Sequence, residues 1–306
     1  WCRKQNIEKL IKKSLSDEDR IGLGLIFHIT PSNIATNFIY SLFFGLLTGN
    51  SNVVKISSKK TIQSEIICKC LNQILRQKKF EKLKRRIVII RYENNDNYTK
   101  NISYKCDLRI IWGGDTSIKA IRKFELNPGS TDITFSDRSS ICVINSNSVI
   151  KADNFNLSIL VDKFYNDTYL VDQNACSSPH IIFWQGSRDT NKIAQKKFWD
   201  KVYFVVKKKY NLERSSAIEK YTILCKKINL LQNNCQFTEY ENLIYILKIK
   251  KLINNLDELR GKWGLFFEYE TNDLNKISGF LNKKFQTLTY FGLDKNICKK
   301  IIIDNL

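Results

Sequence analysis

The chain has 306 residues, of which 43% are hydrophobic and 12% aromatic. This length and composition exclude a disordered chain and allow two domains with substantial hydrophobic cores. The formal net charge of +20 admits nucleic acids, anionic membranes and phosphate-bearing small molecules as partners. The basic residues are spread in short clusters along the chain, and the sequence contains no zinc finger, RNP-like strand or basic zipper. The charge alone therefore indicates no nucleic-acid-binding module.

The cysteines indicate a reducing compartment. Nine cysteines occur at irregular spacing beside only two histidines, a composition that does not form a Cys/His metal cage. Free thiols are typical of the cytoplasm, so we expect a cytoplasmic protein without a bound metal. The first thirteen residues are too charged for a secretory signal peptide. The sequence contains no Met, even at position 1, and we expect upstream residues to be missing.

One uncharged stretch could be interpreted as a membrane span or as a buried core segment. No Lys, Arg, Asp or Glu occurs between Ile21 and Val54. Pro31 and Asn33 interrupt the stretch, and the apolar part after them is shorter than the about 20 residues that a spanning helix requires. The stretch therefore predicts a buried strand followed by a buried helix, and no membrane span.

The first half of the chain alternates short apolar strands with amphipathic helices. The predicted strands are Ile21–Ile29, Asn52–Ile56, Arg86–Arg91 and Leu108–Trp112, and the predicted helices are Ser32–Leu47, Thr61–Lys79 and Thr116–Phe124. Ser32 is predicted to cap its helix, and the run of Ile and Val in Arg86–Arg91 indicates a strand with both faces covered. Repeated strand–turn–helix units predict a parallel sheet of the nucleotide-binding type.

Beyond Asp132 the pattern changes to a second set of strands and helices. The predicted elements are one or two strands over Ile133–Ile144, strands at Ile181–Trp184, Leu265–Tyr269 and Gln286–Tyr290, and helices at Phe155–Leu170 and Asn191–Tyr210. We therefore predict an α/β protein of two domains, residues 1–139 and 140–306.

Cys176 is the first candidate for chemistry. It lies in a predicted turn of small residues, Gln173–Pro179, which precedes a strand. A cysteine in such a turn is accessible, and nearby backbone N–H groups can stabilise its thiolate and an oxyanion on a bound carbonyl. Taken alone, a cysteine of this kind is more often an inert thiol.

Three further positions lie where predicted strands meet turns or helices. Asn33 can donate a hydrogen bond to a developing oxyanion, or it can simply cap a helix. Lys55 ends a strand and can reach a ribose or a phosphate, or it can be a surface lysine. Gly113 and Gly114 precede a helix and allow a pyrophosphate to approach the backbone. As a two-glycine signal they are weaker than the GxGxxG fingerprint.

The order and spacing of these motifs are more specific than any one of them. The stretches GLGLIFHITPSNIATNFIYSLFFGLLTGNSNVVKISS, IIWGGDTSIKAIR, ITFSDRSS, QNACSSPHIIFW and KKFQTLTYFG follow one another from about residue 22 to the C-terminus. Together they resemble the aldehyde dehydrogenase superfamily, and within it the acyl-CoA reductases that supply long-chain aldehyde in bacterial bioluminescence. The family's segment upstream of this region is not matched.

The resemblance implies an aldehyde dehydrogenase-like fold, with a parallel nucleotide-binding sheet in residues 1–139 and a catalytic domain in residues 140–306. It implies that Cys176 is the acyl-accepting nucleophile, and that Asn33 and the Cys176 N–H form the oxyanion hole. It also implies that Lys55 binds the adenosine ribose.

The resemblance further implies roles in cofactor binding for the residues that follow these positions. Gly113 and Gly114 would border the pyrophosphate. Ser57 and Ser58 follow Lys55, and many NAD-using relatives carry a glutamate where this chain has Ser58. Without the negative charge of that glutamate, the site can accept the 2′-phosphate of NADPH. We therefore expect NADPH rather than NADH.

One departure and three further residues remain to be considered. Thr134 stands where hydrolytic relatives have a glutamate general base, which favours reduction of an acyl group over hydrolysis. His28 is expected to be structural, and His180 is considered, and disfavoured, for proton transfer. Glu268 is considered for the acid that binds the nicotinamide ribose.

The implied function is NADPH-dependent reduction of a long-chain fatty acyl thioester to an aldehyde through a Cys176 acyl-enzyme. The implied partners are an acyl-CoA or acyl-protein donor, an acyl-protein synthetase and further copies of the chain in a homo-oligomer, with no nucleic acid. The alternatives are a cysteine-dependent acyltransferase, an inactive relative that retains the fold, and a basic nucleic-acid-binding protein suggested by charge alone.

Overall fold

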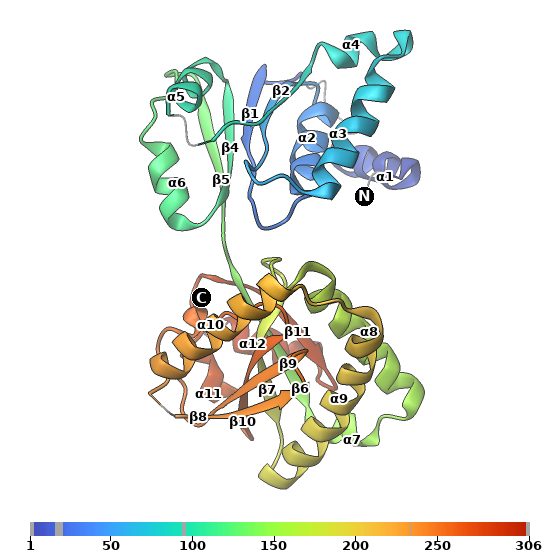
Figure 1. The fold of residues 1–306 in the computed structure, drawn as a ribbon, viewed down its shortest axis with the longest axis vertical. Helices are drawn as coiled ribbons and strands as arrows, with labels where there is room; N and C mark the ends of the chain where they lie inside the picture. The colour runs from blue at the N-terminus through green and yellow to red at the C-terminus, as the bar shows by residue number, and fades with distance from the viewer. Residues whose placement is uncertain (1–2, 16–20, 94–95, 233, 304–306) are drawn as a thin grey trace. The chain divides into compact units, whose positions relative to one another are not determined.

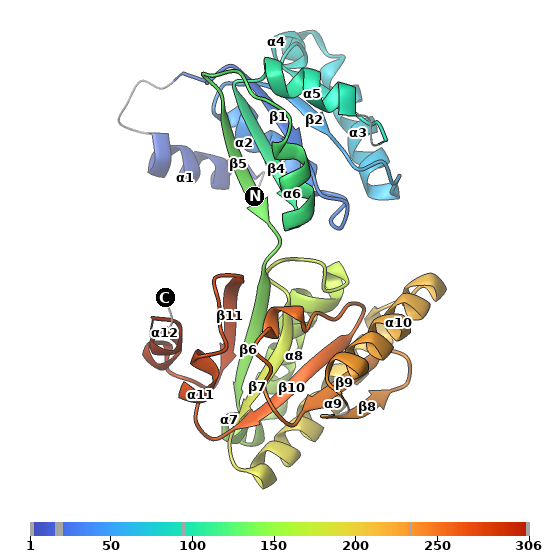
Figure 2. The same cartoon turned by 90° about the vertical axis from the view of Figure 1, so that its left-hand side faces the viewer.

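The computed structural model describes residues 3–15, 21–93, 96–232 and 234–303. Contacts within the chain divide it into two compact units, Trp1–Asp137 and Arg138–Leu306. Each unit is built on one β-sheet with helices on both faces (Figures 1 and 2). Of the helices described, none combines the length and the apolar character that crossing a membrane requires.

The sheet of the first unit is parallel throughout, as predicted. Its strands are β1 (Leu25–Ile29), β2 (Ser51–Lys55), β3 (Ile87–Ile90), β4 (Leu108–Gly113) and β5 (Thr131–Ser136), in the order β3-β2-β1-β4-β5. The chain builds outward from β1 to β3 and then returns to place β4 on the other side of β1. This reversal creates a topological switch point between β1 and β4, where open α/β sheets bind ligands at the carboxyl ends of their strands.

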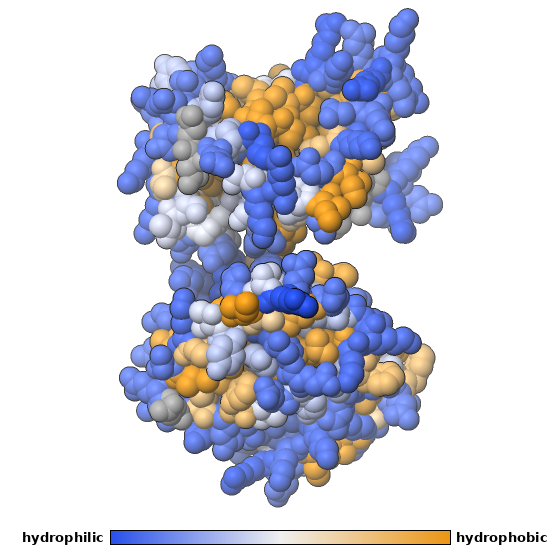
Figure 3. All heavy atoms as spheres, in the orientation of Figure 1, coloured by the Kyte–Doolittle hydropathy of each residue, from blue (hydrophilic) through white to orange (hydrophobic). Residues whose placement is uncertain are grey.

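Helices cover the two faces of this sheet with separate apolar clusters. The helices of this unit are α1 (Lys4–Leu15), α2 (Asn37–Leu47), α3 (Ile62–Leu75), α4 (Glu81–Lys84), α5 (Asp96–Lys105) and α6 (Asp115–Arg122), with a 3₁₀ turn at Lys78–Phe80. One cluster joins α2 and α3 to the sheet, and the other joins α5 and α6 to it. Figure 3 shows that apolar side chains also reach the surface over the strands of this unit.

Two local predictions in the first unit are wrong. Ser32 does not cap a helix, because residues 32–36 form bends and turns and α2 begins only at Asn37. The strand β3 is not covered on both faces, because it is the edge of the sheet and Val88 is 49% exposed. The helix predicted over Thr61–Lys79 is present as α3, which ends at Leu75, and the Thr61 side chain caps it by accepting a hydrogen bond from the Ser64 N–H.

A buried polar network ties α2 to the first two strands, and it confirms the structural role expected of His28. The His28 ring is fully buried, with Nδ1 2.7 Å from Ser41 Oγ and Nε2 2.9 Å from Asn52 Oδ1. Burial lowers the pKa of His28, so the neutral ring is favoured. A Cβ at Gly45 would lie 2.0 Å from Asn52 Oδ1, so only glycine lets α2 approach this network.

The second unit contains a six-stranded sheet. Its strands are β6 (Ser139–Asn145), β7 (Pro179–Gln185), β8 (Cys235–Tyr240), β9 (Ile244–Ile249), β10 (Leu265–Thr271) and β11 (Phe285–Phe291), in the order β11-β6-β7-β10-β9-β8. Only β8 of these strands runs antiparallel to its neighbour. The apolar region Ile133–Ile144 is therefore two strands, β5 and β6, which belong to different sheets and are separated by Asp137 and Arg138.

Side-chain alternation assigns each face of the second sheet to its own helices. The helices are α7 (Ser146–Lys151), α8 (Asn154–Thr168), α9 (Arg188–Lys209), α10 (Arg214–Leu230), α11 (Asn275–Ser278) and α12 (Lys295–Ile303), with 3₁₀ turns at Tyr169–Val171 and Leu256–Glu258. On β7, Ile182 and Trp184 face the cluster of α8 and α9, whereas Ile181 and Phe183 face that of α10, α11 and α12. Period-two alternation of this kind is expected of a strand buried on both faces.

A buried ion pair joins the edge strand β5 of the first sheet to its neighbour β4. Arg109 on β4 is 1% exposed and forms two hydrogen bonds to Asp132 on β5, with Nε–Oδ1 and Nη2–Oδ2 distances of 2.7 and 2.9 Å. A third donor of Arg109 reaches the Phe124 carbonyl at 3.0 Å. Removing Arg109 would leave the largely buried carboxylate of Asp132 with only the half-exposed Arg122 as a charged partner.

We therefore expect Arg109→Met to lower the free energy of unfolding by about 3–5 kcal/mol. Arg122 lies 3.5 Å from the same carboxylate but is half exposed, and Arg122→Met should cost less than about 1 kcal/mol. Urea denaturation followed by circular dichroism measures both values. Equal losses for the two variants would contradict the role assigned to Arg109.

Candidate active site

Cys176 lies on an ordered turn at the amino end of β7. Its side chain is exposed and free. The Cys176 carbonyl accepts a 2.6 Å hydrogen bond from the Ser140 hydroxyl at the start of β6, and the Ser178 N–H donates to the Ala175 carbonyl at 3.0 Å. The backbone on both sides of the thiol is therefore held while the thiol itself faces solvent. This arrangement suits a nucleophile, a role that stays a prediction.

The turn is held in place by Gln173, a residue that sequence reasoning missed. Gln173 is 1% exposed, and its side-chain amide spans to the start of β10. Its Oε1 accepts from the Gly264 N–H at 2.8 Å, and its Nε2 donates to the Leu265 carbonyl at 3.2 Å. Asp172 and Gln173 both have positive φ, of 54° and 56°, a conformation that is costly for residues other than glycine. No sequence pattern signals this contact, because its partners are 91 and 92 residues away.

His180 is enclosed by the second unit. It is 2% exposed, and neither ring nitrogen has a hydrogen bond of good geometry to a described residue. Burial lowers the pKa of His180 to about 3, with a further lowering from the charge of Arg260, while the nearby Gly261 backbone acts weakly in the opposite direction. The ring is therefore neutral at physiological pH, which agrees with the low expectation for a role as proton donor.

Glu268 is also enclosed, and the expectation that it binds the nicotinamide ribose is wrong. It is 3% exposed, and one carboxylate oxygen accepts hydrogen bonds of 2.6 Å from the indole nitrogens of both Trp184 and Trp199. Burial raises the pKa of Glu268 to about 7. The side chain is a buried anchor of β10 and cannot reach a ribose.

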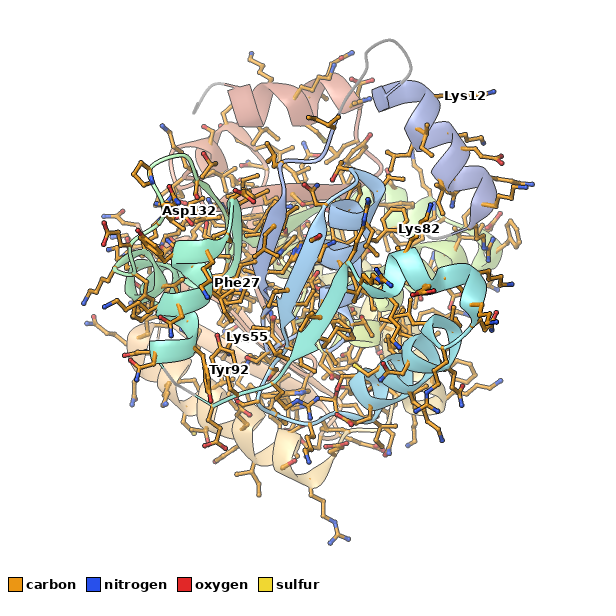
Figure 4. All side chains as sticks on the ribbon, turned by 90° about the horizontal axis from the view of Figure 1, so that it is seen from above. Lys12, Phe27, Lys55, Lys82, Tyr92 and Asp132 are labelled. Carbon is orange, nitrogen blue, oxygen red and sulfur yellow. The ribbon has the colours of Figure 1, made fainter. Side chains whose placement is uncertain are left out.

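In the first unit, Lys55 stands at the carboxyl edge of the sheet. It is the last residue of β2, and its carbonyl accepts from the backbone and the hydroxyl of Thr30 at 3.1 and 2.8 Å. The Lys55 ammonium lies 4.9 Å from the centroid of the Tyr92 ring, and Figure 4 shows the two side chains close together. Burial lowers the pKa of Lys55, because part of its water shell is lost.

The two serines after Lys55 form a short turn. Ser57 is half buried, and its hydroxyl accepts a 3.2 Å hydrogen bond from the Lys59 N–H. Ser58 and Lys59 are exposed. The turn therefore presents one hydroxyl and one ammonium to solvent near the end of β2, a donor set that suits a ribose or a phosphate.

Gly113, Gly114 and Asn33 lie at the same carboxyl edge of the first sheet. Gly114 caps α6, and a Cβ there would have only an ordinary 3.8 Å contact to Asp137 Oδ1. Packing thus does not demand glycine, and the bare backbone leaves room for a phosphate. The carboxylates of Asp115 and Asp137 oppose an anion at this position. Asn33 is exposed in the bend between β1 and α2.

The structure therefore brings Asn33, Lys55, Ser57, Ser58, Gly113 and Gly114 to one edge of the first unit, and it places Cys176 in the second unit. Among the described residues, no group of His, Cys, Asp and Glu side chains could hold a metal ion. The eight described cysteines are all free.

Comparison with solved structures identifies the fold. KauB, an aldehyde dehydrogenase from Pseudomonas aeruginosa, matches 99% of this chain and 65% of its own with a TM-score of 0.69 and 13% identity. The NAD-dependent benzaldehyde dehydrogenase from Corynebacterium glutamicum matches 93% of this chain with a TM-score of 0.65 and 12% identity, and the chain covers 62% of its length. Betaine aldehyde dehydrogenase from Staphylococcus aureus, solved with NAD⁺, matches 93% of this chain and 58% of its own with a TM-score of 0.62 and 14% identity. The fold is that of the aldehyde dehydrogenases, of which the chain spans about three fifths.

The comparison with protein families assigns the chain to a narrower group than its fold does. Residues 3–202 match the family described as acyl-CoA reductase (LuxC), and the chain belongs to this family. The curated proteins contain no sequence that matches the chain. The resemblance to the acyl-CoA reductases is thus confirmed.

The environment of Glu268 predicts a pH dependence of stability. Its pKa rises from 4.5 in the unfolded chain to about 7 in the fold, so the folded state keeps a proton that the unfolded state releases. Stability is therefore lost as the pH rises from about 4.5 to 7, by up to about 3 kcal/mol. Glu268→Gln keeps an oxygen for both indoles and cannot ionise. The stability of the variant relative to the unchanged chain should therefore increase over this pH range and level off above it.

Urea denaturation at pH 5, 6, 7 and 8, followed by tryptophan fluorescence, measures this difference. Trp184 and Trp199 report directly on the surroundings of Glu268. A difference that stays constant from pH 5 to pH 8 would contradict the proposed protonation.

Proposed function

We propose that the chain reduces a long-chain fatty acyl thioester to an aldehyde with NADPH, through an acyl group held on Cys176. The observation that carries the proposal is an exposed thiol on a clamped turn in a member of the acyl-CoA reductase family. The open carboxyl edge of the first sheet supports a dinucleotide as the second reactant.

The chemistry begins with nucleophilic attack. The Cys176 thiolate attacks the thioester carbonyl, the donor thiol leaves, and the acyl group becomes bound to the enzyme. The Cys176 N–H and the Asn33 side chain would donate hydrogen bonds to the oxyanion that forms. When bound, the nicotinamide supplies a hydride, which carries the two electrons of the reduction. The resulting thiohemiacetal on Cys176 releases the aldehyde and restores the sulfur.

The residues at the edge of the first sheet fit a phosphorylated cofactor. Lys55 and the hydroxyls of Ser57 and Ser58 would hold the adenosine ribose, and Gly113 and Gly114 would border the pyrophosphate. Ser58 adds no negative charge, and Lys59 adds a positive one, which favours a 2′-phosphate and therefore NADPH. Two structural relatives are described as NAD-dependent or solved with NAD⁺, which supports a nicotinamide cofactor in general.

Thr134 on β5 supports the direction of the reaction. It stands where a hydrolytic relative would have its general base, so water is poorly activated against the thioester. An acyl-CoA or an acyl-protein from a synthetase partner would be the donor, and we expect the enzyme to work in the cytoplasm as a homo-oligomer. A cysteine acyltransferase without hydride transfer is the alternative that the same thiol supports.

The first experiment tests the nucleophile. After incubation with palmitoyl-CoA, the unchanged chain should gain one acyl mass on the tryptic peptide that contains Cys176, because the exposed thiol attacks the thioester. Cys176→Ser should lose this adduct and reduce aldehyde formation by at least about a thousandfold. Peptide mass spectrometry and NADPH absorbance measure the two effects.

Cys225→Ser is the matched control, since Cys225 is another exposed free thiol of the second unit. It should leave the adduct and the reaction unchanged. An adduct with no consumption of NADPH would favour the acyltransferase alternative, and an adduct that persists in Cys176→Ser would overturn the assignment of Cys176.

The second experiment tests the cofactor preference. Ser58→Glu places a carboxylate beside the expected 2′-phosphate, so it should shift the ratio of NADPH to NADH affinity toward NADH by roughly tenfold. Calorimetric titration with each nucleotide measures the ratio. Ser215→Glu, at an exposed serine of the second unit, adds the same charge elsewhere and should leave the ratio unchanged. Equal ratios in both variants would refute the role of Ser58.

A further inference from the structure

A pair of tyrosines continues the carboxyl edge of the first sheet beyond Lys55. Tyr92 follows β3 by two residues, and Tyr98 lies in the first turn of α5. Their ring centroids are 5.5 Å apart with an interplanar angle of 57°. The rings therefore form a tilted aromatic pair at the end of the strand that neighbours β2.

Tyr92 is fixed from two sides. Its hydroxyl lies 3.0 Å from the hydroxyl of Thr99, which is itself 7% exposed, and burial raises the pKa of Tyr92. The Lys55 ammonium lies over its ring at 4.9 Å, a cation–π contact (Figure 4). Tyr92 thus positions the candidate ribose-binding lysine, and most of the surface of Tyr92 is covered by its neighbours.

Tyr98 differs from Tyr92 in its exposure. It is 57% exposed on a helix that is otherwise mostly polar and that packs on the sheet through Ile102. An aromatic ring that is braced on one side and open on another offers a stacking surface for a planar, uncharged ring. The ring lies within the span of one adenosine nucleotide from the Lys55 ammonium, because Tyr92 contacts both residues.

We propose that Tyr98 is the stacking platform for the adenine ring of the cofactor, and that Tyr92 is a positioning residue that holds both Tyr98 and Lys55. The proposal rests on the proposed use of NADPH and adds a binding residue to it. Adenine fits because its face stacks on an aromatic ring, while the attached ribose and its phosphate extend toward the cation beside Tyr92. A purely structural tyrosine pair would leave nucleotide affinity unchanged.

Direct binding tests the proposal without relying on activity. Tyr98→Ala should weaken the binding of adenosine 2′,5′-bisphosphate and of NADPH by roughly 5- to 150-fold, the effect expected for loss of one base-stacking contact. Nicotinamide mononucleotide, which lacks adenine, should bind with unchanged affinity. Isothermal titration calorimetry with the full chain measures all three dissociation constants.

Two variants serve as controls. Tyr98→Phe keeps the ring and should bind all three probes as the unchanged chain does. Tyr104→Ala removes another tyrosine of α5 with a similar exposure, 54%, and should have no effect. Because Tyr98 is largely exposed, its replacement should not unfold the first unit, and circular dichroism checks this.

The outcomes separate this inference from the proposed function. If the unchanged chain binds NADPH and Tyr98→Ala binds it equally well, the stacking role is overturned while the proposed reaction stands. If Tyr98→Ala weakens nicotinamide mononucleotide as much as adenosine 2′,5′-bisphosphate, stacking is likewise overturned. If the unchanged chain binds no NADPH, the stacking role of Tyr98 and the proposed use of NADPH are both overturned. Acyl capture by Cys176 is tested separately, by the acyl adduct on its tryptic peptide.

Discussion

The side chain of Gln173 bridges the turn that carries Cys176 to the start of β10. Both ends of its amide are paired with backbone groups of Gly264 and Leu265. Asp172 and Gln173, four and three residues before Cys176, both have positive φ, and such backbone is kept only where surrounding contacts fix it. If this clamp were absent, the turn would relax and Cys176 would be one exposed thiol among several. The proposed chemistry therefore depends on an amide that itself takes no part in the reaction.

In the first unit, polar groups gather at one edge of the sheet, away from the hydrophobic core. Parallel strands deliver their carboxyl ends to one edge, so Asn33, Lys55, Tyr92 and Gly113 meet there although they are far apart in the chain. The apolar clusters lie on the two faces, away from this edge. Two buried polar side chains of the unit, His28 and Arg109, form hydrogen bonds that stabilise the frame.

In the second unit, burial removes from solvent two residues that the sequence analysis considered for chemistry. His180 is kept neutral, and Glu268 is held between two indoles. Cys142 is likewise enclosed, and burial raises the pKa of its thiol to about 12. Cys176, by contrast, is exposed, so it differs from Cys142 in its surroundings.

The sequence alone was sufficient for the α/β class, the parallel first sheet and the family, because strand–turn–helix repetition and ordered motifs are local signals. It also identified Lys55 and Gly113 as strand-end residues. It misplaced Ser32 and Glu268, since burial and capping depend on what packs against a residue. It missed the contacts of Gln173 and Tyr98, whose partners lie on other elements. Only the tertiary structure determined these contacts, because hydrogen bonds and ring contacts between segments distant in the chain leave no periodic trace in the sequence.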